Sequence, residues 1–179
     1  MNPIKYFFQF SIIFFLFMIF KVLGLKYSSN FSSWLLKIFG PFFRSKKLIE
    51  QNILKAFPSK NHKDQKKIIM DMWGNYGRIL SEYVFLKNFR ESKFKDNIEV
   101  IGQNILKEIK EDGKPVIFIS GHFNNFELMA MHIEKSGVDL AVIYRPLNNK
   151  FLNSLMEKIR KKYICKNQIK KGMAGTRQL

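Results

Sequence analysis

The chain has 179 residues, about the length of one domain, and 46% of them are hydrophobic. Its formal net charge is +17, but 25 of the 31 basic residues are lysine, which argues against a dense surface for bidentate phosphate recognition. The single cysteine, Cys165, excludes an internal disulfide and a cysteine-rich zinc site and is compatible with a reducing compartment.

The N-terminus is membrane-seeking. The run from Phe7 to Phe20 carries no charge, and Lys5 and Lys21 can extend it to nearly spanning length by placing their amines at the interface. A cleaved signal peptide is the main alternative, but the first residues are barely basic and no small-residue cleavage site follows. We therefore expect an uncleaved membrane anchor in residues 1–26. From Lys21 to Met70 there are 11 basic and two acidic residues, so the positive-inside rule places the body in the cytoplasm.

Residues 27–96 are expected to form a helical, membrane-proximal region. Its first segment, Phe31 to Phe43, mixes aromatic residues with basic flanks, which suits either an interfacial helix or a core helix. Helical periodicity continues through residues 45–56 and 60–86, with a break at residues 57–59. One stripe at helical spacing is more typical of a core than of a ligand site: Trp73, Tyr76, Leu80 and Tyr83.

Residues 97–179 are predicted to be the α/β core. The pattern predicts a helix over 103–112 closed by Gly113, a strand over 115–120, a helix over 124–136, a strand over 138–144 and a helix over 149–164. Strand–helix–strand with short glycine turns predicts a parallel βαβ layer with a ligand site at the carboxyl ends of the strands.

A candidate catalytic pair stands at the end of the first predicted strand. His122 follows Gly121, and Glu127 comes five residues later. On one unbroken helix the two side chains would point about 140° apart, so they can meet only if His122 precedes the helix and Asn124 or Asn125 caps it. Glu127 could then hold one ring nitrogen while the other accepts a proton. The bare pattern is equally compatible with a capping box beside an ordinary loop histidine.

Arg145 follows the second predicted strand and should reach the same edge of the sheet. It could be a ligand contact there or a surface charge. The neighbouring Asn148 and Asn149 could equally be turn and cap residues.

Several segments, in order, resemble the lipid A acyltransferases, the lauroyl/myristoyl-type enzymes of the lysophospholipid acyltransferase superfamily. The resemblance is carried by GHFNNFEL (121–128), YRPLNN (144–149), an Arg160-containing helix and GMAGTRQL (172–179), with NILKAFP (52–58) and WGNYGR (73–78) upstream. It covers most of the chain after the anchor.

The resemblance implies a glycerolipid-acyltransferase type of α/β fold and an enzyme of the bacterial inner membrane whose catalytic part is cytoplasmic. It would move a fatty acyl chain from acyl carrier protein to a hydroxyl of a lipid A precursor, an anionic glycolipid. In its His-x4-Glu motif, His122 would be the base and Glu127 would orient it. Arg145, Asn149 and Arg177 would contact substrate. No cofactor and no metal are implied, because a thioester needs no metal activation.

The chain ends where relatives continue through further strands, so we expect a fragment or truncated version with an incomplete sheet. A catalytically inactive membrane-associated scaffold is the main alternative function. A metallohydrolase using His122, Glu127 and His132 fits poorly, because that spacing does not present three ligands from one helix face. A nucleic-acid-binding module would suit the charge but not the apolar N-terminus, so no nucleic-acid partner is expected.

Overall fold

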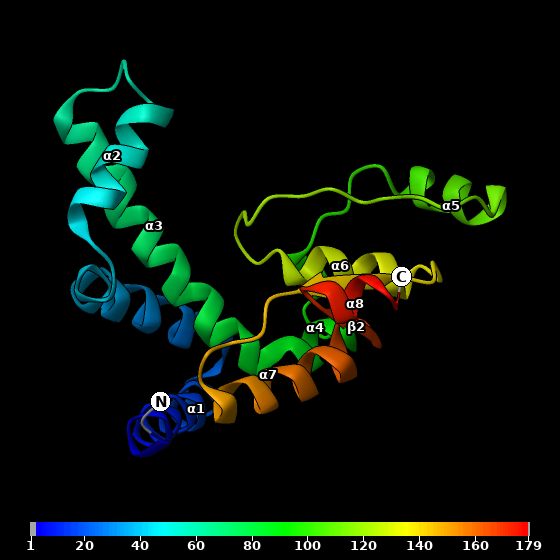
Figure 1. The fold of residues 1–179 in the computed structure, drawn as a ribbon, viewed down its shortest axis with the longest axis horizontal. Coiled ribbons are helices and arrows are strands. Elements are labelled where there is room, and N and C mark those ends of the chain that lie inside the picture. Colours follow the sequence, from blue (N-terminus) through cyan, green and yellow to red (C-terminus); the bar gives the residue numbers. More distant parts are fainter. Residues whose placement is uncertain (1–2, 179) are drawn as a thin grey trace. The chain divides into compact units, whose positions relative to one another are not determined.

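The computed structural model describes residues 3–178 and is mostly helical (Figure 1). In chain order its elements are α1 (Pro3–Phe39), the 3-10 turn η1 (Gly40–Phe43), α2 (Lys46–Ala56), α3 (His62–Glu82), η2 (Tyr83–Phe85), α4 (Leu86–Arg90), η3 (Lys95–Asn97), α5 (Gln103–Asp112), α6 (Glu127–Lys135), β1 (Ala141–Tyr144), α7 (Lys150–Tyr163), β2 (Asn167–Lys170) and α8 (Met173–Thr176). They form two compact units, residues 16–85 and residues 1–15 with 86–179.

The unit of residues 16–85 is helical. Within α1 the backbone leaves helical geometry at Gly24, whose φ of 74° is left-handed, and the bend brings the ring of Phe20 to 6.4 Å from that of Phe31. Beyond the bend, small residues let α1 approach α3 closely. A Cβ atom on Gly77 would overlap the carbonyl oxygen of Ser32, so glycine is required at that contact.

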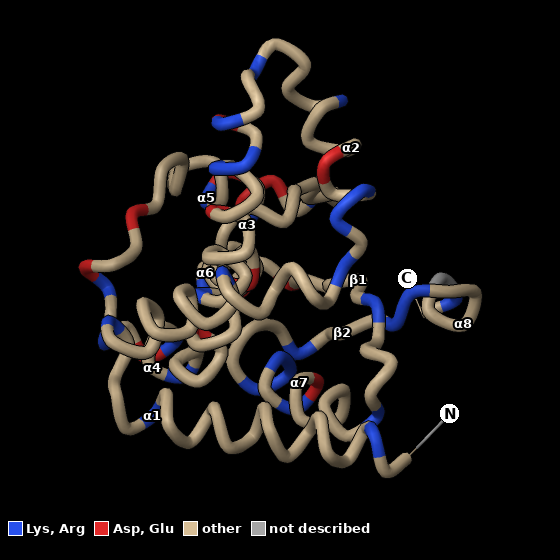
Figure 2. Tube along the Cα trace, turned by 90° about the vertical axis from the view of Figure 1, so that its left-hand side faces the viewer, with Lys and Arg blue, Asp and Glu red and all other residues tan. Residues whose placement is uncertain are grey.

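The other unit contains the sheet. β1 and β2 pair in parallel, with Ala141 opposite Asn167 and Tyr144 opposite Lys170, and α7 is the crossover between them. α7 begins cleanly because the side chain of Asn149 accepts hydrogen bonds from the amides of Phe151 and Leu152. In Figure 1 β2 lies between α6 and α7, and in Figure 2 β1 and β2 run side by side to the right of α6.

Arg90 of α4 ties three helices of this unit together. Its guanidinium pairs with Glu134 of α6 at 2.5 Å and donates to the carbonyl oxygens of Tyr163 and Ile164 at the end of α7. These carbonyls have no partner within the helix, so a cation there satisfies them and the local dipole together. Around this junction lies the buried core of the unit, formed by Leu86, Phe89, Met131, Ile133, Ile164, Cys165 and Ile169.

The predicted strand over 115–120 is wrong for the described chain, where these residues join no ladder. Ile117 and Ile119 are 87% and 92% exposed. The partner of β1 is instead β2, which the sequence did not indicate because Asn-Gln-Ile-Lys is short and mostly polar. A parallel βαβ unit is present, but it is β1–α7–β2 rather than the one expected.

Other boundaries match more closely. The helix predicted over 103–112 is confirmed as α5, closed by a left-handed Gly113. The helices predicted over 45–56 and 149–164 are confirmed as α2 and α7 to within one residue at each end. The helix expected over 60–86 ends at Glu82, and that over 124–136 begins only at Glu127. In the aromatic stripe of α3, Trp73 and Tyr83 are buried, whereas Tyr76 is 52% exposed.

The predicted anchor forms the first part of α1. Among the described residues, Pro3–Phe43 is the one helical stretch that is long and apolar enough to cross a membrane by length and composition.

Candidate active site

A cleft of about 1250 Å³ runs along β1 in the unit of residues 1–15 and 86–179. One wall is residues 114–122, the other comprises residues 137–145, and α6 contributes Glu127, Met129 and Ala130. The cleft therefore lies where a ladder between residues 115–120 and β1 was expected. Its lining is mostly apolar, with a few charged side chains, as is usual for a small-molecule site.

His122 is exposed at this cleft, in the irregular chain just before α6. Its ring packs edge-to-face on the ring of Phe126, with centroids 4.4 Å apart. The left-handed residue of this turn is Asn124, with a φ of 44°, rather than Gly121. The predicted cap by Asn124 or Asn125 is wrong, because Phe126 occupies that position without a side-chain bond.

Glu127 is the first residue of α6 and is only 5% exposed. Its Oε1 accepts a hydrogen bond from Nε of Arg160 at 2.8 Å and lies 2.7 Å from Nη2 of the same residue. The expected hydrogen bond from Glu127 to His122 is not present among the described residues. Arg160 also lies 5.8 Å from the ring centroid of Tyr144, so the pair joins α6, α7 and β1.

The other predicted site residues divide into two groups. Arg145 directly follows β1 and lines the cleft together with His122 and Glu127, as expected. Asn149 and Arg177 lie outside the set of described residues that line it. The side chain of Asn149 is buried as the cap of α7, and Arg177 is exposed at the end of α8. Their contact with substrate stays a prediction.

Tyr144, at the end of β1, faces both the cleft and Glu157 of α7. Burial, reinforced by the nearby Glu157 carboxylate, raises the pKa of Tyr144 to about 12. Burial acts to raise the pKa of Glu157 as well. The tyrosine hydroxyl and the charges of Lys170 and Lys161 outweigh burial, so the pKa of Glu157 is lowered. Tyr144 therefore stays protonated while Glu157 stays ionised near neutral pH.

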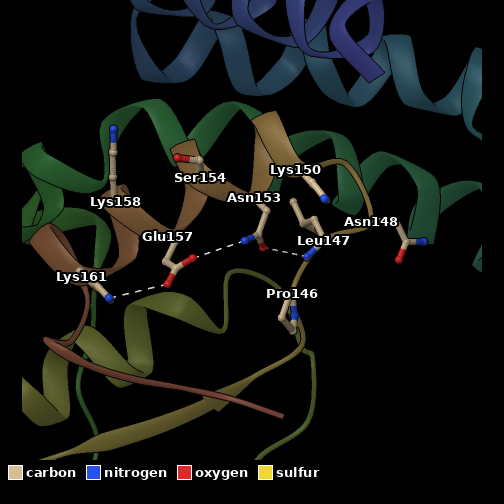
Figure 3. Close-up of a pocket in the computed structure, with 9 residues that line it drawn as sticks. All are labelled: Pro146, Leu147, Asn148, Lys150, Asn153, Ser154, Glu157, Lys158 and Lys161. Atoms are coloured by element: carbon tan, nitrogen blue, oxygen red, sulfur yellow. Dashed lines mark hydrogen bonds and ion pairs between the residues drawn. The ribbon is translucent and has the colours of Figure 1, made fainter. Parts of the chain in front are cut away.

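Glu157 also belongs to a second, smaller pocket of about 470 Å³ beside the N-terminal half of α7 (Figure 3). Asn153 donates to Glu157 at 3.3 Å and accepts from the amide of Leu147 at 2.8 Å, which fixes the loop before α7. Lys150, Lys158 and Lys161 give this pocket a positive rim. Lys158 points away from Glu157 and Lys161 in Figure 3.

Arg160 is a residue of this site without a role in the sequence motifs, but its position in the chain carries a signal. Arg160 follows Asn153 and Glu157 at helical spacing on the half-buried side of α7, where an amphipathic helix normally carries apolar residues. A charged residue on the inward face of a helix requires a buried partner, and Glu127 is that partner.

The arrangement is that of an α/β protein with a histidine-bearing cleft and no metal-ligand cluster of three or more His, Cys, Asp or Glu side chains in residues 3–178. The model of one family, bacterial lipid A biosynthesis acyltransferase, matches residues 2–171. The chain therefore belongs to the bacterial lipid A biosynthesis acyltransferase family. No curated protein and no solved structure matches it.

Proposed function

We propose that this chain transfers a fatty acyl group from the thioester of acyl carrier protein to a hydroxyl of a lipid A precursor. The reaction would take place at the cytoplasmic face of the bacterial inner membrane. Family membership supports acyl transfer in lipid A biosynthesis, and the observation that carries the site assignment is that His122, Glu127 and Arg145 line a single cleft.

In the proposed reaction His122 is the general base. Its neutral imidazole takes the proton of the acceptor hydroxyl as the oxygen attacks the thioester carbonyl. The new C–O bond forms, the C–S bond breaks, and the imidazolium returns its proton to the leaving thiolate. Arg145, exposed at the same cleft, would stabilise the developing oxyanion or hold a phosphate of the acceptor.

Glu127 would fix the ring of His122 once the acceptor is bound. Catalytic hydrogen bonds are often long or misaligned in a free enzyme and tighten only with substrate, so the contact of His122 with Phe126 is compatible with this role. The two contacts from Arg160 hold the Glu127 carboxylate in place at the first turn of α6.

The cleft also suits the acyl chain. Its volume of about 1250 Å³ exceeds the usual range for drug-sized ligands, and Val116, Ile117 and Met129 give it apolar walls. The net charge of +17 would favour both an acidic carrier protein and an anionic glycolipid, because opposite charge raises the local concentration of each. No cofactor enters the proposal.

The test is a thioester-consumption assay with acyl carrier protein as donor. His122→Ala should lower turnover by at least about 10²-fold. Glu127→Ala should lower turnover nearly as much. The double variant should lower it only a little further, because paired residues act as a unit. His62→Ala, at an exposed histidine of α3, is the control and should be fully active.

Full activity of a folded His122→Ala variant would end the assignment of the base. A folded wild-type chain that consumes no thioester would instead favour the inactive scaffold.

A further inference from the structure

The beginning of α1 is docked on α7 rather than projecting from the protein. Nδ2 of Asn149 donates to the carbonyl oxygen of Tyr6 at 2.8 Å and lies 3.4 Å from Oε1 of Gln9. The ring of Phe151 contacts those of Phe7 and Phe10, at centroid distances of 5.8 and 6.0 Å. The first two turns of the apolar helix thus belong to the same unit as the cleft.

The same helix is held again farther along. Phe20 is fully buried and contacts Phe31 beyond the Gly24 bend. Ser32 then packs on Gly77 of α3, in the unit of residues 16–85. The apolar stretch therefore makes protein contacts near both of its ends, which a free membrane anchor would not do.

The path of the chain restricts how such a helix can meet a bilayer. The chain leaves one unit after Phe15 and re-enters it at Leu86. If α1 crossed the membrane between its two contacts, the chain would have to cross back before Leu86. Among the described residues beyond Phe43, none form a helix long and apolar enough to do this. A crossing would otherwise pull Tyr6 away from Asn149 and leave that buried amide unpaired.

The docked helix has a bare apolar face. Tyr6, Gln9, Phe10 and Ile13 are partly covered, whereas the opposite side exposes Ile4, Phe8, Ile12 and Phe15, with Phe8 at 66% and Phe15 at 65%. At about 100° per residue, these four positions fall within an arc of about 80°. Figure 2 shows this segment running beneath α7 with almost no charge along it.

A lysine borders this face on the same helix. Lys5 is exposed, and at about 100° per residue it lies about 20° beyond Ile12. An apolar helix face beside a lysine is the composition that binds anionic lipid headgroups while inserting into the acyl region.

We propose that residues 3–15 of α1 lie in the plane of the membrane, with Ile4, Phe8, Ile12 and Phe15 inserted in one leaflet of an anionic bilayer and the rest of their own unit, residues 86–179, on one side of it. The cleft is then held at the surface from which a membrane-resident acceptor would be drawn. This placement of the helix at the bilayer does not depend on the proposed acyl transfer, because it is inferred from the contacts of α1 alone.

The first test is the sidedness of the N-terminus. The intact chain carrying a hydrophilic epitope tag before Met1 is placed in inside-out membrane vesicles, together with a cysteine at the exposed position 112 (Asp112→Cys) as a marker of the body. Protease and a membrane-impermeant thiol reagent should reach the tag and the marker from the same face. A tag protected while the marker reacts would show that α1 spans the bilayer and overturn the proposal.

The second test identifies the occupant of the face. The chain should float with vesicles of phosphatidylethanolamine and phosphatidylglycerol, and a Phe8→Glu/Phe15→Glu variant should lose at least about tenfold of that binding. Ile101→Glu, at an equally bare apolar residue outside α1, is the matched control and should float as wild type. Unchanged flotation of the α1 variant, or loss of a dimer instead of loss of lipid binding, would overturn it. Flotation is measured independently of acyl transfer, so failure of this proposal can be told apart from failure of the proposed function.

Discussion

At the scale of single residues, the Glu127–Arg160 pair joins α6 to α7 beside the cleft. Both side chains are largely buried, with exposures of 6% and 16%, so each charge needs the other. Removing one partner of a buried pair leaves an uncompensated charge, whereas removing both is far less costly. The pair is thus a positioning device as well as a structural tie between α6 and α7.

Arg160→Ala should therefore lower the free energy of unfolding by about 3–5 kcal/mol. The double variant Arg160→Leu/Glu127→Leu should recover much of this stability but none of the activity. Urea unfolding followed by circular dichroism measures both. Lys107→Ala, which breaks an exposed pair with Glu111, is the control and should change stability by less than about 1 kcal/mol. Equal losses in the single and double variants would contradict the interpretation.

Tyr144 gives a second prediction at this scale. Because its pKa is raised to about 12 in the folded protein, the native state favours its protonated form. The contribution to stability is complete below the ordinary tyrosine pKa of about 10 and is lost as the pH rises from there through about 12. Tyr144→Phe should remove that alkaline loss. The absorbance of tyrosinate at 295 nm measures the ionisation, and thermal melts between pH 9 and 12 measure the loss of stability. If the melting temperature of the variant falls with pH as steeply as that of the wild type, the prediction is wrong.

At the scale of elements, the sequence predicted helices better than strands. α5 and α7 carry their own caps, Gly113 and Asn149, so local chemistry fixes their ends. The run over 115–120 has the composition of a buried strand, but a ladder needs a neighbouring strand about 4.8 Å away, and the cleft occupies that space. Whether a segment pairs as a strand depends on a partner that is distant in the sequence. The sequence of one segment therefore cannot predict the pairing, and for the same reason β2 was not predicted.

The same limit applies to α1. Both of its faces are apolar, so its sequence has almost no amphipathic signal and resembles a spanning helix. Which face is covered by protein depends on Asn149 and Phe151, more than 130 residues away in the chain. The candidate site follows this pattern: His122 and Arg145 could be predicted from local motifs, whereas the Arg160 contact required the fold.

The close contact of α1 with α3 predicts how glycine-to-alanine substitutions in α3 change stability. Gly→Ala inside a helix normally stabilises it by up to about 1 kcal/mol. Gly77→Ala should instead destabilise, because the new methyl group meets the backbone of Ser32 and Ser33, which cannot move aside. Gly74→Ala is the matched control: its nearest neighbour is Cε of the flexible Lys37 side chain at 2.5 Å. In thermal melts the melting temperature of Gly77→Ala should be well below that of Gly74→Ala. The reverse order of the two melting temperatures would refute the close contact.

At the scale of the whole molecule, the chain builds two units from three segments, because residues 1–15 join residues 86–179. The domain boundaries at residues 26 and 96, where composition changes, stay predictions. The compact units themselves divide after Phe15 and after Phe85, inside α1 and at the end of η2. Neither division coincides with a glycine- or proline-rich linker, so composition could not show it.

This division predicts that damage stays within a unit. Gly77→Ala should speed amide hydrogen exchange across α2 and α3 while leaving the exchange of β1, α7 and β2 near the wild-type rates. Asn149→Ala removes the α7 cap and the Tyr6 contact. It should speed exchange in β1, α7 and β2 while leaving the exchange of α2 and α3 near the wild-type rates. Exchange followed by mass spectrometry on the membrane-bound full chain would measure both. Equal acceleration of both sets of peptides in either variant would mean that the two units unfold as one, because opening one would then expose the other.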